Sequence, residues 1–332
     1  MIETASFGGV VAAGFVLVAV FVYWFLHRTR GSDAASQSTA SADTETGGSR
    51  LPFLERADDS SSGPIDPQIL LPVPNDAETG CRLTAIACAL KHRYGDEPLR
   101  LLRIEDGTAP DADAFAERLD ERETATNTAI RSETIDDEDV TDAIVRAAPE
   151  PNTDLVVATW TATDGAASEG VVDGIVSRTP LPIYRFRLAR SPDELARLRV
   201  VLPRHVDHHE GFYEGIYNVK QLADNLGLPI TVYVFEQTVD HYRTLFDLVE
   251  IDVLAEFRSV DSWAVLESKL RTDGEPDDLL LALAVREDEI GWDPELPTVG
   301  DRFAELPPRS LGLWYLRKDE PAYDERFLRT ES

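Results

Sequence analysis

Short apolar runs alternate with longer stretches of helical periodicity over most of the chain, beginning near residue 67. In the first part, apolar runs bounded by polar or turn-forming residues predict strands at 69–73, 99–104, 129–135, 154–160 and 181–188. Apolar residues three and four positions apart predict helices at 78–94, 112–123 and 136–148, with a short helix before the last strand. Strands that alternate with helices indicate a mostly parallel sheet.

The same order of elements recurs in the second part of the chain. Apolar runs predict strands at 198–203, 230–235, 254–260, 279–285 and 311–316. Helical periodicity predicts helices near 212–226, 238–249 and 262–271. The segment 286–308 departs from this order: it contains four prolines and predicts a loop with at most one short helix.

Both parts open and close in the same way, which indicates an internal repeat. Each opens with an apolar run that ends in proline, at Pro72 and at Pro203, and each closes with a hydrophobic run. A repeat of this length indicates two similar domains rather than solenoid units. We therefore expect an α/β fold of two tandem open, mostly parallel sheets with helices on both faces. The domains span 67–190 and 195–318, and a tail, 319–332, follows them.

The beginning of the chain predicts a membrane anchor. Residues 7–26 are apolar and contain no charged residue, and about 20 helical residues cross a hydrocarbon core of about 30 Å. Basic residues at 27–30 follow this run and none precede it, so we expect a single-pass anchor, 1–30, with the N-terminus outside and the later domains in the cytoplasm. A cleaved signal peptide is the alternative, which the missing basic n-region and the long apolar run disfavour. Residues 31–66 predict a flexible acidic linker.

The charge of the chain is strongly unbalanced, with 61 acidic and 32 basic residues and a formal net charge of -29. Such a surface suits a halophilic protein, because concentrated salt screens the self-repulsion that the charge causes. A surface that binds a cationic partner is the alternative. Nucleic acid is excluded as a partner because no basic stripe is present to contact phosphates.

Several segments resemble the universal stress protein family, once in each part of the chain. The resemblance rests on 69–76, 154–158 and 180–186 in the first part and on 200–203, 226–233 and 278–283 in the second. The resemblance covers roughly residues 67–318. The chain is also similar to the paired stress-protein-like domains at the cytoplasmic end of some cation/proton antiporters and amino-acid permeases. The resemblance implies a regulatory or sensor module for stress response or transport, with an antiporter or permease as partner. It also implies that the closing strands, 181–188 and 311–317, lie at the interface of an internal pseudo-dimer.

The nucleotide-binding members of this family carry a glycine-rich loop after the fourth strand, and the chain departs from that pattern. Ala158-Thr-Trp-Thr161 follows the fourth strand of the first part, and the later glycines are spaced differently. Arg286-Glu-Asp-Glu289 follows the corresponding strand of the second part, where four charges, three of them acidic, would repel a triphosphate. We therefore expect no cofactor, with ATP or AMP bound through a divergent loop as the alternative.

Five residues are candidate ligand contacts. Asn75 and Asp76 follow the first strand and Ala158 ends the fourth, at the edge where open α/β sheets bind ligands. For Asp76 the preferred interpretation is the cap of the following helix. His205 and Asp207 belong to the cluster 205–210, which combines imidazoles and carboxylates.

The cluster 205–210 has two further interpretations. Its side chains suit a divalent metal, but neighbouring residues seldom converge on one ion, so a polar loop that caps the next helix is preferred. Histidines could also make the loop responsive to pH. The Walker, nucleophile-elbow and zincin motifs are missing from the sequence. We expect no enzyme, no catalytic residue and no metal ligand, and metal-dependent hydrolysis at 205–210 remains the enzymatic alternative.

Overall fold

A computed structural model describes residues 67–73, 76–91, 97–105, 115, 117–119, 128–136, 139–148, 153–159, 166–235, 239–303, 306–307 and 310–318. All of these residues lie within the unit Gly63–Ser332. The predicted anchor, the linker 31–66 and the tail lie outside the described residues. Among the described helices, none is both long and apolar enough to cross a membrane.

The described strands form one sheet, in the order β3-β2-β1-β4-β5-β10-β9-β6-β7-β8. Five of them come from what we call the first half of the sheet: β1 (Ile69–Val73), β2 (Leu99–Glu105), β3 (Ile130–Asp136), β4 (Leu155–Thr159) and β5 (Ile183–Arg187). The other five form the second half: β6 (Arg197–Leu202), β7 (Ile230–Val234), β8 (Ala255–Ser259), β9 (Asp278–Ala284) and β10 (Ser310–Tyr315). Read from its outer edge inward, each half has the same order, because β8-β7-β6-β9-β10 mirrors β3-β2-β1-β4-β5.

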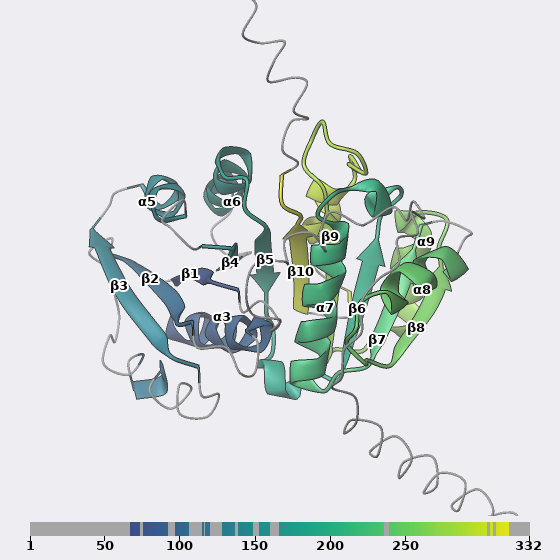
Figure 1. Cartoon of the computed structure of the whole chain (residues 1–332), viewed down its shortest axis with the longest axis horizontal. Coiled ribbons are helices and arrows are strands. Elements are labelled where there is room, and N and C mark those ends of the chain that lie inside the picture. Colours follow the sequence, from purple (N-terminus) through teal and green to yellow (C-terminus); the bar gives the residue numbers. More distant parts are fainter. Residues whose placement is uncertain are drawn as a thin grey trace, which may run out of the picture. The chain divides into compact units, whose positions relative to one another are not determined.

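The two halves join through β5 and β10, which pair antiparallel with Leu313 opposite Arg185. All other pairings in the sheet are parallel. The expectation of two separate sheets is therefore wrong in this respect: there is one ten-stranded sheet. Because the central pair is antiparallel, the carboxyl ends of the strands point in opposite directions in the two halves (Figure 1).

Helices cover both faces of the sheet, as the sequence predicts (Figure 1). The first half contributes α3 (Ala77–Leu90), α5 (Val140–Ala147) and α6 (Ala166–Arg178). The second half contributes α7 (Phe212–Leu226), α8 (Val239–Asp247), α9 (Trp263–Asp273) and the short α10 (Val299–Arg302), with short 3-10 turns at Pro192–Glu194, Val206–His208 and Leu296–Thr298. In the predicted helix 112–123, residues 115 and 117–119 are described and helical.

Two hydrophobic layers hold the helices against the sheet. The layer on one face contains buried side chains of α3, α7 and α8, such as Ile86, Phe212 and Tyr242. The layer on the other face contains buried side chains of α5, α6, α9 and α10, such as Ile175 and Trp263. Strands β4 and β9 are buried nearly throughout, which explains why their sequences are continuous apolar runs.

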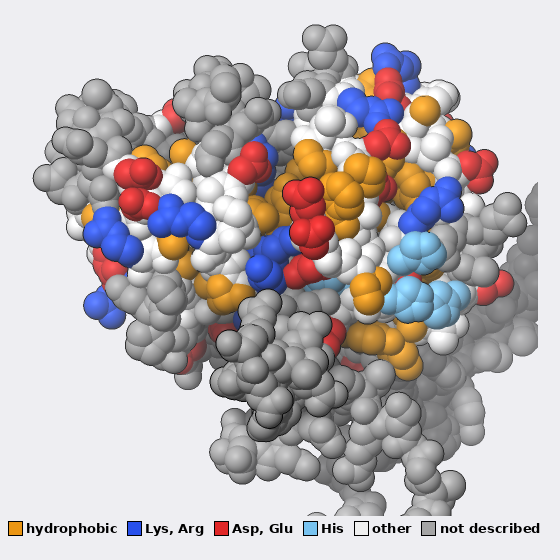
Figure 2. Space-filling model, turned by 90° about the horizontal axis from the view of Figure 1, so that it is seen from above, with side chains coloured by type: hydrophobic (Ala, Val, Ile, Leu, Met, Phe, Trp, Pro, Cys, Tyr) orange, Lys and Arg blue, Asp and Glu red, His pale blue; other side chains and the backbone are white. Residues whose placement is uncertain are grey.

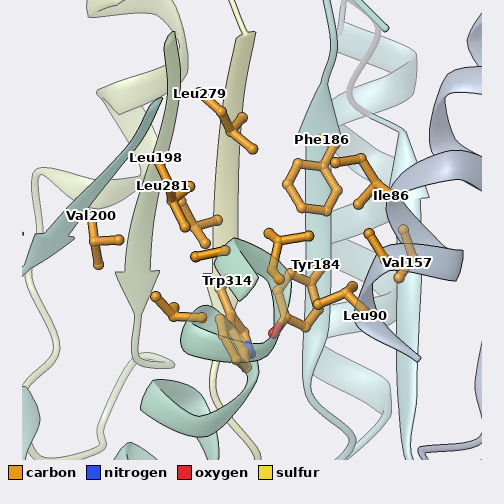
Figure 3. Close-up of a cluster of buried hydrophobic side chains, with 14 of the residues drawn as sticks. Ile86, Leu90, Val157, Tyr184, Phe186, Leu198, Val200, Leu279, Leu281 and Trp314 are labelled. Atoms are coloured by element: carbon orange, nitrogen blue, oxygen red, sulfur yellow. The ribbon is translucent and has the colours of Figure 1, made fainter. Parts of the chain in front are cut away.

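The first layer is continuous across the junction of the halves. Figure 3 shows Tyr184 and Phe186 of β5 between Ile86 on one side and Trp314 of β10 on the other. The helices α3 and α7 also meet over this junction. Asn225 of α7 donates hydrogen bonds to the carbonyl oxygens of Ala89, at 2.8 Å, and Lys91, at 2.9 Å. A side chain of the second half thus satisfies carbonyl groups at the end of a helix in the first half.

Candidate functional site

The carboxyl edge of the first half brings two of the predicted residues to neighbouring strands. Asp76 follows β1 and Ala158 lies near the end of β4, and β1 pairs with β4. Ala158 is 5% exposed, so it contributes packing at this edge. Asn75 lies outside the described residues. The predicted contact of these residues with a ligand stays a prediction.

Asp76 caps helix α3. Its backbone is extended, with φ -79° and ψ 111°, and its Oδ2 accepts a hydrogen bond of 2.8 Å from the backbone N–H of Thr79. The hydrogen bonds with Thr79 hold the pKa of the Asp76 carboxyl below its usual value. This geometry is the helix-cap interpretation of Asp76, and it explains why the helix begins at Ala77.

The carboxyl edge of the second half contains the predicted residues His205 and Asp207. His205 has the left-handed conformation, with φ 61°, and leads into the 3-10 turn Val206–His208. The Asp207 carboxylate accepts hydrogen bonds from the Tyr242 hydroxyl, at 2.9 Å, and pairs with His241 Nε2 at 3.0 Å. Burial by itself would raise the pKa of Asp207, but the bonds from His241 and Tyr242 and the nearby His208 hold it below its usual value.

Histidine side chains gather on one part of this surface (Figure 2). The rings of His205 and His208 stack with centroids 6.1 Å apart, and His208 Nε2 lies 3.9 Å from the Asp207 carboxylate. His208 and His241 are exposed, with 64% and 49% of their side-chain surface accessible. Within the parts of the chain that the structure describes, no three His, Cys, Asp or Glu side chains are placed to hold a metal ion.

His209 is buried and occupies a fixed orientation. Its Nδ1 accepts a hydrogen bond of 3.0 Å from the backbone N–H of Gly211, directly before α7. We assign the proton to Nε2, because Nδ1 accepts this bond. Nε2 lies 3.3 Å from Oε2 of Glu289, in the loop after β9. A histidine of the cluster therefore connects the start of α7 with the loop of a neighbouring strand.

The loop after β9 covers this edge of the sheet. Gly291 has φ 92°, and a Cβ at this position would lie 3.0 Å from the His205 carbonyl oxygen and from the Val206 Cα. Only glycine combines the left-handed backbone conformation of residue 291 with so close an approach. In the same loop, Asp293 accepts a hydrogen bond of 2.8 Å from Trp263 Nε1. The edge at which open α/β sheets commonly bind ligands is occupied here by the protein's own loop.

Arg286 is one of the four charged residues that the sequence places after β9, and it differs from the three acidic ones in being buried. Its side chain is buried, and it donates hydrogen bonds to the carbonyl oxygens of Val176, Thr179 and Leu181, which end α6 and lead into β5, and to that of Leu316. The cation is therefore used to join the two halves, while Glu287, Asp288 and Glu289 remain in the loop.

Three residues of this arrangement were not predicted from the sequence: His241, Tyr242 and Glu289. His241 and Tyr242 lie in α8, which follows β7, and Glu289 follows β9. Both strands pair with β6, so the segments that follow them meet the loop 203–211 at the same edge. The order of the strands would have indicated these neighbours, because the connections after adjacent parallel strands lie together.

Comparisons with known proteins establish the fold. No protein-family model matches the sequence, and no curated relative matches it. The structure is similar to the cytoplasmic domain of a prokaryotic cation chloride cotransporter, with a TM-score of 0.55 and 10% identity over 78% of this chain and 98% of that domain. It is also similar to a candidate universal stress protein from Pseudomonas aeruginosa, with a TM-score of 0.50 and 12% identity over 76% of this chain and 94% of the other.

A protein of unknown function from the same species gives a similar match, with a TM-score of 0.50 and 12% identity over 76% of this chain and 93% of the other. The fold is thus of the universal stress protein type, as the resemblance implied. At identities this low, the similarity shows the fold alone.

Proposed function

We propose that the chain is a regulatory or sensor module that acts through contact with a transporter and has no catalytic activity. On this proposal it is a single-pass membrane protein whose described domain lies in the cytoplasm. The two halves are degenerate copies of one stress-protein-like domain, packed as an internal pseudo-dimer through β5 and β10. The partner is a cation/proton antiporter, an amino-acid permease or a related transporter.

The observation that carries this proposal is the closed carboxyl edge of the second half. Asp207, His209 and Asp293 are bonded to side chains or backbone of the same chain, and Gly291 lies against His205. A site filled in this way favours a role in protein contact over one in ligand turnover. The shared fold with a transporter's cytoplasmic domain supports the choice of partner.

The candidate site also supports a sensor role. Asp207 and its histidine neighbours hold the turn 205–209, and Arg286, in the loop that covers this turn, is bonded to the end of α6 in the first half. A change of protonation at the turn would therefore act next to the junction of the halves. Histidine is the side chain best suited to such a change near neutral pH.

Binding of ATP or AMP at the first half is the competing function. Asp76 and Ala158 favour it, because they lie at the ends of two paired strands, at the edge where nucleotides bind in open α/β sheets. The capping bond from Thr79 uses one oxygen of Asp76. The other oxygen would be the acceptor available to a ribose hydroxyl group.

Equilibrium binding of labelled ATP to the full chain in high salt separates these two functions. We expect no saturable binding at micromolar ATP. Micromolar binding that is lost in Asp76→Ala but kept in Asp139→Ala would contradict the proposal. Asp139 is the matched control, because its carboxylate caps α5 through the N–H of Asp142, at 3.0 Å, as Asp76 caps α3. Both variants lose a helix cap, and only one loses the candidate contact.

Association with a transporter is tested by crosslinking in native membranes, followed by identification of the crosslinked proteins. We expect one transporter as the main product. Recovery of the chain crosslinked only to itself would contradict the proposed partner.

A further inference from the structure

Two polar groups are buried together where the two halves join. Tyr184 of β5 and Trp314 of β10 are direct partners in the antiparallel pair, and their ring centroids are 4.0 Å apart. Figure 3 shows the Tyr184 hydroxyl and the Trp314 indole nitrogen at the same end of this ring pair. The two residues are 0% and 1% exposed, so bulk solvent does not reach either polar atom.

Neither Tyr184 Oη nor Trp314 Nε1 has a hydrogen-bond partner within the described parts of the chain. An indole N–H can only donate, whereas a phenol hydroxyl can donate or accept. Native proteins pair nearly all such buried groups with protein atoms or with ordered water. Because no hydrogen bond joins these two neighbouring groups to each other, a small acceptor between them would pair both donors.

The charge around the hydroxyl decides which small acceptor fits. Burial, and then the negative charge of Glu214, raises the pKa of Tyr184 well above its usual value. Glu214 is partly balanced by Arg317, whose Nε lies 3.3 Å from the carboxylate. A carboxylate that disfavours the tyrosinate also disfavours an anion such as chloride at the same place. A neutral acceptor avoids this repulsion.

We infer that one buried water molecule binds between Tyr184 Oη and Trp314 Nε1. Water accepts both hydrogen bonds and retains hydrogens for other polar neighbours, as buried waters in proteins commonly do. Its two protein partners belong to different halves of the sheet. The water is therefore part of the junction between the halves, together with the paired rings.

A crystal structure of the full chain grown in a bromide salt tests the site directly. We expect density for one water oxygen within hydrogen-bonding distance of both atoms, without an anomalous signal. A bromide peak at this position would show that the site takes an anion and would overturn the inference. Clear density for both side chains with nothing between them would overturn it as well.

Denaturant unfolding of the full chain provides a second test. Tyr184→Phe keeps the ring and removes only the hydroxyl. If the hydroxyl holds a water, its loss lowers the folding equilibrium constant by roughly threefold to tenfold. An unpaired hydroxyl would instead give a more stable variant on removal, which would contradict the inference. Tyr242→Phe is the reference for loss of a direct bond, because the Tyr242 hydroxyl donates to Asp207 at 2.9 Å.

The double variant Tyr184→Phe, Trp314→Phe completes a thermodynamic cycle. Either single substitution removes one partner of the water, so the loss in the double variant should be smaller than the sum of the single losses. If the two single losses of stability simply add in the double variant, the two groups do not share one water molecule.

Discussion

The side-chain amide of Asn225, in α7, donates to the carbonyl oxygen of Ala89, in α3, at 2.8 Å. It also donates to the carbonyl of Lys91, at 2.9 Å. These bonds cross the junction of the two halves, and they satisfy carbonyl groups that the end of α3 leaves without helical partners. The junction is therefore held by directional bonds as well as by apolar packing.

Replacing Asn225 tests this relationship. Asn225→Ala should lower the free energy of unfolding by about 1 kcal/mol, because two partly buried hydrogen bonds are lost. Asn225→Asp should lower it further, because a carboxylate would face two carbonyl oxygens. Urea unfolding of both variants measures the difference, and equal stability of the two would contradict the assigned bonds.

Gly291 should tolerate alanine poorly. It has φ 92°, and a Cβ there would press on backbone atoms of His205 and Val206, whereas Gly227 has φ 67° with nothing within 4 Å of an added Cβ. Gly227→Ala should cost about 1 kcal/mol from backbone strain alone. Gly291→Ala should cost clearly more in the same thermal or urea unfolding assay. Similar losses in the two variants would mean that the loop does not lie close against the turn 205–209.

Arg286 should be difficult to replace, even by lysine. Its guanidinium donates to carbonyl oxygens at the end of α6 and to that of Leu316. Arg286→Met would leave several buried carbonyls unpaired, and we expect a loss of about 2–4 kcal/mol in the free energy of unfolding. Lysine has a single ammonium group in place of the planar fork, so Arg286→Lys should recover only part of this loss. Full rescue by lysine would argue against the fork geometry.

Asp207 should make stability depend on acid pH. Its pKa is lower in the folded protein than in the unfolded chain, so its ionised form stabilises the fold at pH values above the usual carboxyl pKa of about 3.9. This contribution is lost as the pH falls through the lower folded value. Compared from about pH 5 downward, the difference in unfolding free energy between the parent and Asp207→Asn should therefore shrink below about pH 4. A difference that grows on acidification would contradict the assigned bonds.

The periodicity of the sequence predicted most elements because their burial follows from local pattern. The helix predicted at 212–226 is α7 (Phe212–Leu226), and the apolar run at 279–285 is the buried strand β9 (Asp278–Ala284). Where a tertiary contact ends a helix, prediction was less accurate. The helix predicted to reach residue 249 ends at Asp247, and Lys220 Nζ donates to the carbonyls of Phe246 and Val249 there.

The candidate site was predicted only in part for the same reason. Asp76 was found because it follows a strand, and His205 because it belongs to a local cluster of imidazoles and carboxylates. Their partners depend on which strands are neighbours, and periodicity does not give the order of strands in a sheet. The continuous sheet likewise arises from the antiparallel pairing of β5 and β10, in which Leu313 lies opposite Arg185. This pairing depends on packing between side chains that are far apart in the sequence, and no local pattern specifies it.

The most direct test of the proposed function is the stoichiometry of the chain with its partner in membranes. The full chain, purified in mild detergent from the membranes of the cells that produce it, would be quantified by mass spectrometry against internal standards. The account predicts one transporter present in a fixed, near-integer ratio to the chain, and retained in high salt. Purification of the chain without any transporter, together with saturable binding of ATP at micromolar concentration, would contradict it.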